Sequence, residues 1–286
     1  MAAASRFGSN LPFLPFQRSL SLFSLLSLLF SSFFVPLAVP NTASDSSPFF
    51  AVCPIVYRLD ESASPRGYHY TFFGNAFFIN DEGYLLTAAH VLDTFRNGGQ
   101  PYILVSRADS PPRFLKVTLV AADSAHDVAI LRATPNPFGG KFKVAFLSLT
   151  SEAAVPGQSV LAVSLHPARL ADAQSLESPR EDRSSGQVLS FTSTQLDKSA
   201  APAEIFLLSH SVTRGQSGSP VLAVDARGAA GAVVGLVEGR WLRSAAASPQ
   251  SSSTASDSVS GAAVPIRYAI GLLQQHSIAW HKPAGS

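Results

Sequence analysis

Short apolar runs separated by turn-forming residues dominate the chain after residue 48. Within these runs apolar and polar residues alternate, and β-branched and aromatic residues are frequent. The pattern is typical of strands, because successive side chains of a strand point to opposite faces. In the first half of the chain it predicts strands at residues 49–58, 70–79, 84–87, 102–106, 114–121 and 128–132. The turn-forming residues 80–83 predict a hairpin, and residues 90–92 a short helical turn.

The second half repeats the pattern. It predicts strands at residues 159–165, 187–192, 205–209, 221–224, 232–237 and 261–264. Two stretches lack it and are expected to be surface loops: the charged residues 169–185, and residues 242–260, which are dense in Ser and Ala. Pro265 can stand in the first turn of a helix whose apolar residues, three or four positions apart, form one stripe.

The predicted fold class is therefore all-β, with two six-stranded antiparallel β-barrels and a C-terminal helix. One domain is expected at residues 49–276. Its parts are a first barrel at about 49–150, a second barrel at about 151–264 and a helix at 265–275, followed by a tail at 277–286.

Residues 1–48 have a different composition from the rest of the chain. Arg6 and Arg18 precede an uncharged run at residues 19–39, and no acidic residue occurs before Asp45. The run is long enough to span a bilayer, which favours an export signal or an anchor and an extracytoplasmic, secreted or membrane-anchored protein. The alternative is a chloroplast or other organellar transit peptide, which the opening Met-Ala-Ala-Ala-Ser fits, and it stays open.

The overall composition excludes some classes of protein. Apolar residues make up 46% of the chain and charged residues 14%, which indicates a substantial core. The formal net charge of +2 predicts no nucleic-acid partner. The single cysteine, Cys53, excludes an internal disulfide framework.

Candidate chemistry begins with the stretch TRGQSGSP at residues 213–220. Gly215 and Gly218 permit a tight loop around the Ser217 hydroxyl. Such a loop can aim the N–H groups of Gly215 and Ser217 at one point, as a developing oxyanion requires. Taken alone, the stretch could also be an ordinary surface turn.

Two further stretches favour the chemical interpretation. His90 ends the run GYLLTAAHV at residues 83–91, and Asp127 opens the run HDVAIL at residues 126–131. Histidine is the usual general base, and a carboxylate at a strand end can hold its imidazole in one tautomer. The catalytic residues are predicted to be His90, Asp127 and Ser217, with His126 as a rival base and Asp123 as a rival orienting residue.

With these motifs the chain resembles the trypsin-like serine proteases of the chymotrypsin fold, and among them the HtrA/Deg-type branch. GNAFFI at 74–79, SGQVL at 185–189 and VPI at 264–266 fit the same branch, and the resemblance covers about residues 50–275. Gln216 and Ser219 depart from it, since the branch usually has Asn and Gly there. Too few residues follow the helix for a PDZ domain, so none is expected.

The resemblance implies a serine endopeptidase that hydrolyses polypeptide substrates through an acyl-enzyme, in protein quality control or processing. No metal and no cofactor are predicted. Ser211 would lie at the base of the substrate pocket, where a neutral serine favours apolar substrate residues. Glu238, Gly239 and Arg240 would border that pocket.

Several alternatives remain. A non-catalytic scaffold or chaperone-like binder on the same fold is the main alternative function. Membrane association through residues 19–39 and oligomer formation also stay open.

Overall fold

The computed structural model of the chain describes residues 47–58, 70–95, 99–105, 112–139, 142–166, 179–242 and 259–283. All described residues belong to one compact unit, Thr42–Ser286. None of the helices in these ranges has both the length and the apolar content that a bilayer-spanning helix requires. The predicted signal or anchor at 19–39 lies outside them.

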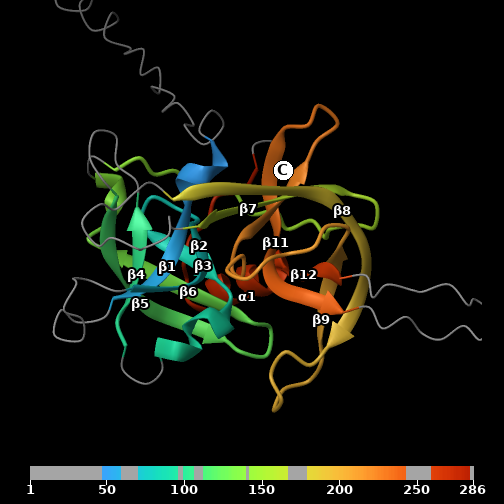
Figure 1. Cartoon of the computed structure of the whole chain (residues 1–286), viewed down its shortest axis with the longest axis horizontal. Coiled ribbons are helices and arrows are strands. Elements are labelled where there is room, and N and C mark those ends of the chain that lie inside the picture. The colour runs from blue at the N-terminus through green and yellow to red at the C-terminus, as the bar shows by residue number, and fades with distance from the viewer. Residues whose placement is uncertain are drawn as a thin grey trace, which may run out of the picture. The chain divides into compact units, whose positions relative to one another are not determined.

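The first barrel closes through antiparallel pairing of six strands. They are β1 (Val52–Arg58), β2 (Tyr70–Phe78), β3 (Tyr84–Thr87), β4 (Pro101–Val105), β5 (Arg113–Asp123) and β6 (Val128–Thr134). Their order around the barrel is β1-β2-β3-β6-β5-β4, and β4 pairs back onto β1 (Figure 1). Because β3 pairs with β6, with Thr87 opposite Ala129, the segments that follow Thr87 and precede Val128 lie side by side.

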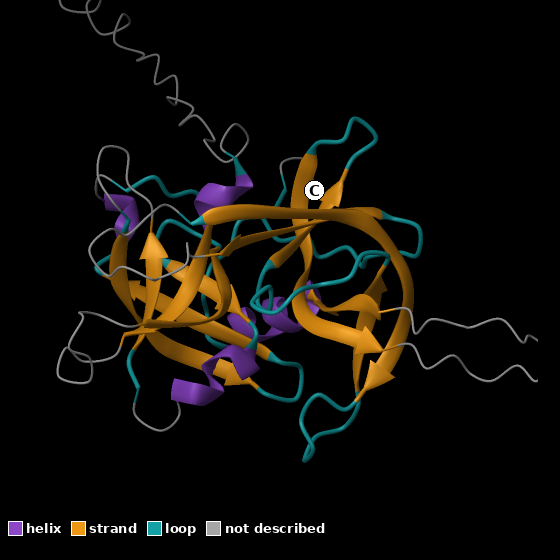
Figure 2. Cartoon of the chain, viewed as in Figure 1, coloured by secondary structure: helices purple, strands orange, loops and turns teal. Residues whose placement is uncertain are grey.

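The second barrel has the same design. Its strands are β7 (Ser159–His166), β8 (Arg180–Thr194), β9 (Ala203–Leu208), β10 (Pro220–Val224), β11 (Ala230–Leu242) and β12 (Val259–Pro265). They follow the order β10-β11-β12-β9-β8-β7, and the helix α1 (Ile266–Gln275) comes directly after β12. The described residues also form the 3-10 helices η1 (Pro48–Ala51), η3 (Ala89–Phe95) and η4 (Pro137–Gly139) (Figure 2).

The predicted fold class is confirmed, but two predicted loops are partly wrong. Strand β8 begins at Arg180, inside the expected loop at 169–185, and residues 180–187 pair one by one with β7. Charged residues fit this strand because many of its side chains are exposed. Strands β11 and β12 likewise enter the expected loop at 242–260, by one residue at its start and two at its end.

A single apolar cluster joins the two barrels and the helix. Phe77 and Ile130 from the first barrel pack in the same cluster as Ile205 and Leu236 from the second and Leu273 from α1, all fully buried. Each barrel also has a cluster of its own. Because the shared cluster is close-packed, it fixes how the barrels meet.

The connection between the barrels provides a test of this shared core. Leu149 is fully buried in the joint cluster, and its N–H donates to the carbonyl of His281 at 2.9 Å. We expect Leu149→Ala to lower the free energy of unfolding by about 2–5 kcal/mol, because truncation leaves a cavity. Urea unfolding followed by fluorescence measures the change.

Val155 offers the matched control on the same connection, since it is 56% exposed. Val155→Ala is expected to change the free energy of unfolding by no more than about 0.5 kcal/mol. Equal losses in the two variants would contradict the role assigned to Leu149.

Candidate active site

His90 and Asp127 lie together at one end of the first barrel. His90 belongs to η3, just after β3, and Asp127 immediately precedes β6. The Nδ1 of His90 lies 2.7 Å from Oδ2 of Asp127, and the backbone N–H of His90 donates to Oδ1 at 2.8 Å. Asp127 is 5% exposed, so its carboxylate meets the imidazole away from bulk water. An ionised carboxylate only accepts, so Nδ1 carries the proton and Nε2 is left as the acceptor.

The backbone of Asp127 adopts the left-handed region, with φ of 53°. Aspartate tolerates this region better than most residues. Two backbone hydrogen bonds hold Asp127 in this conformation. Its N–H donates to the carbonyl of Ser124 at 3.4 Å, and its carbonyl accepts from the N–H of Ala89 at 3.2 Å. The turn therefore fixes the direction in which the carboxylate leaves the chain.

Charges around the imidazole set its protonation. Burial alone would lower the pKa of His90, but the hydrogen bond and negative charge of Asp127, together with the charge of Glu238, raise it above its ordinary value. The pKa of Glu238 is raised in turn, first by burial and then by the charge of Asp127. Asp93 contributes a smaller charge effect in the same direction, so three carboxyl groups raise the pKa of His90, of which only Asp127 was predicted to act on it.

The loop that carries Ser217 lies between β9 and β10, on the second barrel. Gly215 has φ of 95° and Gly218 has φ of 79°. At Gly215 a Cβ atom would also overlap the ring of Phe72, so both conformation and space demand glycine. Within the described part of the chain, the N–H groups of Gly215 and Ser217 meet no acceptor, which leaves both free to bind an oxyanion.

The hydroxyl of Ser217 is not bonded to His90. Its Oγ donates to the backbone carbonyl of Glu238 at 3.0 Å, and among the described residues no hydrogen bond joins it to the imidazole. Catalytic hydrogen bonds are often unmade before substrate binds. The three predicted catalytic residues are thus arranged as one bonded pair and a separate hydroxyl.

The buried side chain of Gln216 ties the Ser217 loop to strands β7 and β8 of the same barrel by hydrogen bonds. Its side chain is 2% exposed, its Oε1 accepts from the N–H of Thr213 at 2.6 Å, and its Nε2 donates to Ser164 and Asp182 at 3.3 Å each. This network was not predicted from the sequence, because Asp182 was expected to lie in a surface loop. The Ser219 hydroxyl, by contrast, is buried and has no hydrogen-bond partner among the described residues.

The predicted substrate-binding residues flank the same loop. Ser211 is exposed on the segment that leads to Ser217, and Glu238, Gly239 and Arg240 follow one another on β11. The Nε of Arg240 donates to the carbonyl of Val212 at 3.0 Å, which joins β11 to that segment. Their predicted roles in binding stay predictions.

The rival residues pair with each other. The Nδ1 of His126 lies 2.6 Å from Oδ2 of Asp123, and the His126 ring stacks on Tyr268 of α1 at 4.0 Å between centroids. Asp127 rather than Asp123 therefore holds His90.

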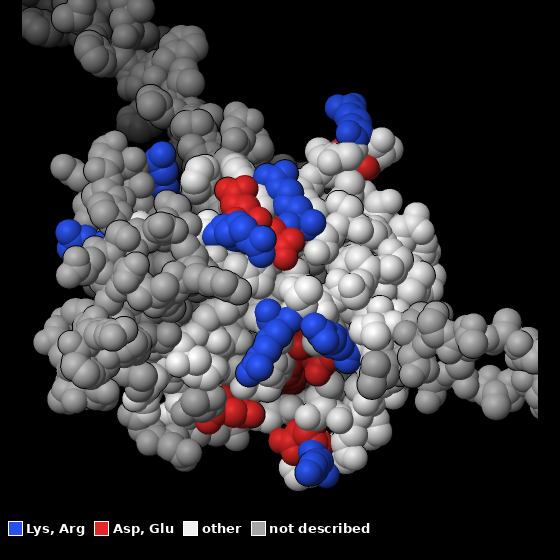
Figure 3. Space-filling model, in the orientation of Figure 1, with Lys and Arg blue, Asp and Glu red and all other residues white. Residues whose placement is uncertain are grey.

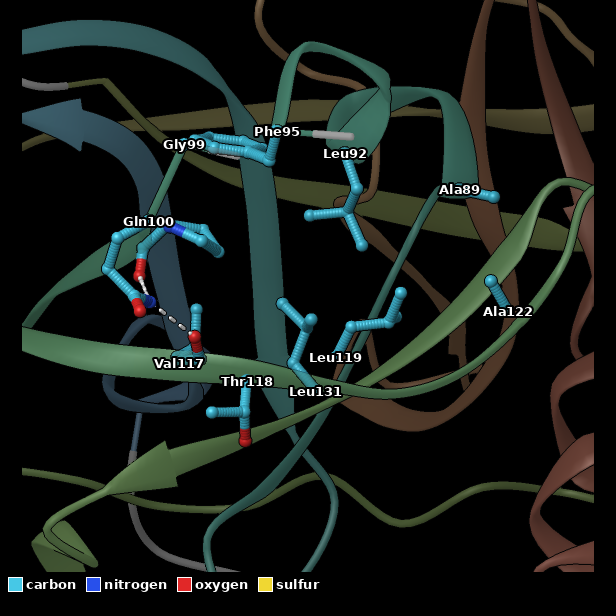
Figure 4. A pocket seen from close by; sticks show the side chains of 11 residues that line it. Ala89, Leu92, Phe95, Gly99, Gln100, Val117, Thr118, Leu119, Ala122 and Leu131 are labelled. Carbon is cyan, nitrogen blue, oxygen red and sulfur yellow. Dashed lines mark hydrogen bonds between the residues drawn. The ribbon is translucent and has the colours of Figure 1, made fainter. Parts of the chain in front are cut away.

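A separate apolar hollow of about 300 Å³ lies on the first barrel. Leu92 and Phe95 of η3 face Leu119 of β5 across it, and the Gln100 side chain donates to the Val117 carbonyl at 2.8 Å (Figure 4). None of the predicted site residues lines this hollow. It lies beside the candidate site and does not form part of it.

One face of the molecule carries charges of both signs. On the face drawn in Figure 3, Lys and Arg atoms lie next to Asp and Glu atoms in small groups over the described residues. Within those residues, no three His, Cys, Asp or Glu side chains converge as metal ligands would. The predicted lack of a nucleic-acid partner stays a prediction.

Comparison with known families identifies the chain. The family of trypsin-like peptidase domains matches residues 74–236, which is more than half of the chain. The chain belongs to the trypsin-like peptidases. The match spans all three predicted catalytic residues of this trypsin-like peptidase, and it confirms the family predicted from the sequence.

Solved structures share the fold of this trypsin-like peptidase. The Rv3671c protease of M. tuberculosis in its active form has a TM-score of 0.52 and 20% identity, over 83% of this chain and 85% of that one. Deg5 has a TM-score of 0.52 and 16% identity, over 82% of this chain and 92% of that one. The HtrA-type protease AlgW with a decapeptide has a TM-score of 0.52 and 19% identity, over 82% of this chain and 66% of that one. A search of curated protein sequences gave no match.

The environment of His90 in this trypsin-like peptidase predicts a measurable titration. We expect Glu238→Gln to lower the pKa of His90, because the substitution removes a negative charge that stabilises the imidazolium. Titration of the imidazole signals by NMR measures the change.

Glu82→Gln is the control, because Glu82 lies exposed in the turn between β2 and β3 and does not contribute to the pKa of His90. An unchanged or higher His90 pKa in Glu238→Gln would contradict the assignment.

Proposed function

We propose that the protein is a serine-type endopeptidase that hydrolyses peptide bonds through an acyl-enzyme. The observation that carries the proposal is the His90–Asp127 pair, bonded at 2.7 Å on one barrel, beside a serine loop of the other barrel. Two N–H groups of that loop have no acceptor among the residues that the structure describes. Membership of the trypsin-like peptidases supports the same chemistry.

In the first step a bond forms between Ser217 Oγ and the carbonyl carbon of the substrate. The hydroxyl proton passes to Nε2 of His90, and the negative charge that develops on the carbonyl oxygen is held by the N–H groups of Gly215 and Ser217. Asp127 stabilises the resulting imidazolium. The carbon–nitrogen bond then breaks as Nε2 donates its proton to the leaving amine.

In the second step water cleaves the acyl-enzyme. Nε2 of His90 takes a proton from water as the water oxygen attacks the acyl carbon, and it returns that proton to Ser217 Oγ as the ester bond breaks. The enzyme is restored, and the balance of atoms requires no metal or cofactor.

The hydrogen bond from Ser217 to the Glu238 carbonyl must break before the first step. Rotation about the Cα–Cβ bond of Ser217 would release the hydroxyl for His90. Before substrate binds, the backbone carbonyl of half-buried Glu238 therefore holds the Ser217 hydroxyl.

We propose polypeptides as substrates and protein quality control or processing as the setting. A neutral Ser211 near the loop supports a preference for apolar substrate residues. An extracytoplasmic or organellar location, membrane association through residues 19–39 and oligomer formation remain proposals from the sequence, because residues 1–46 lie outside the described ranges.

A non-catalytic scaffold or binder of unfolded segments is the second candidate function. One observation favours it: the Ser217 hydroxyl is bonded to Glu238 and not to His90. A binder would need no working nucleophile, so reactivity at Ser217 distinguishes the two functions.

Labelling with a fluorophosphonate tests the proposal directly. We expect the full-length protein to be labelled, and Ser217→Ala and His90→Ala each to lower peptide hydrolysis by about 10⁴-fold or more, because nucleophile and base act as one unit. Gel fluorescence and cleavage of a peptide library provide the two measurements.

Ser199→Ala is the matched control, since Ser199 is an exposed serine in the turn after β8. It should be labelled like the wild type. A folded wild-type protein that is not labelled would overturn the peptidase proposal and favour the scaffold.

A further inference from the structure

One buried polar side chain, Asn75, connects the first barrel to the serine loop of the second. Asn75 lies on β2 and is fully buried, in a strand whose neighbouring residues Ala76, Phe77 and Phe78 belong to the apolar cores. A buried amide costs free energy unless its polar atoms are paired. Its partners therefore explain its position.

Both polar atoms of the side chain are paired across the seam between the barrels. Nδ2 donates to the carbonyl of Gly215 at 2.9 Å, and Oδ1 accepts from the N–H of Leu165 on β7 at 3.0 Å. The partners fix which atom is nitrogen, because a carbonyl can only accept and an N–H can only donate.

The backbone of Asn75 is paired as well. Its N–H donates to the carbonyl of Ser217 at 2.8 Å, and its carbonyl accepts from Oγ1 of Thr87 at 2.7 Å. One residue of the first barrel therefore bonds the carbonyls of both Gly215 and Ser217.

These bonds fix the peptide groups on either side of the Ser217 N–H. The carbonyl of the Gly215–Gln216 peptide is held by Asn75, and its N–H donates to Thr213 at 3.2 Å. The Ser217–Gly218 peptide is held by Asn75 at its carbonyl and by Val237 at its N–H, the latter at 2.8 Å. The peptide between them carries the unpaired Ser217 N–H, so its orientation is determined by its neighbours.

The packing leaves little space for another arrangement. A Cβ atom on Gly74 would lie 2.7 Å from the Ser217 carbonyl, and one on Gly218 would overlap the Asn75 carbonyl. The two chain segments therefore touch backbone to backbone.

We propose that Asn75 is a positioning residue, whose side-chain amide holds the Gly215 carbonyl from across the barrel seam and so keeps the oxyanion-binding N–H groups and Ser217 aligned. The inference rests on the proposed peptidase function for its catalytic consequence. Its structural part, that the amide orders residues 213–219, does not depend on that function.

An amide suits this position because it both donates and accepts. In Asn75→Asp an ionised carboxylate could still accept from Leu165, but it would place an oxygen against the carbonyl of Gly215 in place of a donor. Asn75→Ala removes both bonds without introducing a charge, so it serves as the second variant if the aspartate does not fold.

Asn80 provides a matched control. It is also a nearly buried asparagine of the first barrel, and its Nδ2 donates to a distant backbone carbonyl, that of Ala279, at 2.7 Å. Asn80→Asp makes the same chemical change at a hydrogen bond outside the serine loop. If Asn75 only stabilised the fold, Asn75→Asp and Asn80→Asp would have the same effect on kcat.

Two measurements on the full-length variants test the proposal. In Asn75→Asp and Asn75→Ala, kcat for peptide hydrolysis and the rate of fluorophosphonate labelling should fall by on the order of 10²-fold, close to the loss of one oxyanion donor, with little change in KM. Hydrogen exchange followed by mass spectrometry should become faster in peptides covering 213–219. In Asn80→Asp kcat should stay near the wild-type value, and exchange should rise around 80–84 and 279 instead.

The outcomes separate the two proposals. Equal kcat in Asn75→Asp and Asn80→Asp, or unchanged exchange at 213–219 in Asn75→Ala, would overturn the positioning role. If the wild type is not labelled at all, the peptidase proposal fails, and the exchange measurement alone still decides whether Asn75 orders the loop.

Discussion

The apolar core shared by the two barrels is the constraint on which the rest of the structure depends. Phe77 of the first barrel and Ile205 of the second are fully buried in the same cluster, so neither barrel can shift without opening a cavity. His90 and Asp127 come from the first barrel and Ser217 from the second. Their relative position is therefore determined by apolar burial at some distance from the polar groups that would do the chemistry.

Where this core ends, buried polar groups continue the connection between the barrels. Asn75 and Gln216 are both buried amides. Asn75 pairs its donor and its acceptor with groups of the other barrel, whereas Gln216 pairs with Thr213 of its own loop and with Asp182 of β8 in the same barrel. An uncharged amide can satisfy a backbone carbonyl and a backbone N–H at once, without the desolvation penalty of a buried charge. The serine loop is consequently held from two sides, by Asn75 on the first barrel and by the Gln216 contact with Asp182 on the second.

Glu238 links the geometry of the site to its electrostatics. The pairing of β11 with β12 shifts register at this residue, between Val237 and Gly239, as it does at a β-bulge. The carbonyl of Glu238 accepts the Ser217 hydroxyl, while its carboxyl group raises the pKa of His90. One irregular strand position thus affects both the resting nucleophile and the protonation of the base.

Local patterns in the sequence determined most strands and the two-barrel fold, because alternation and turn-forming residues depend on neighbouring residues alone. Short local motifs also selected His90, Asp127 and Ser217 as the candidate catalytic residues. The charged start of β8 was misread as a loop, since only pairing with β7 shows that its outward face meets solvent. The role of Asn75 could not be predicted from the sequence, because its side-chain partners lie 90 and 140 residues away along the chain. Packing of one barrel against the other brings such partners together, so the arrangement of the candidate site was decided only by the tertiary structure.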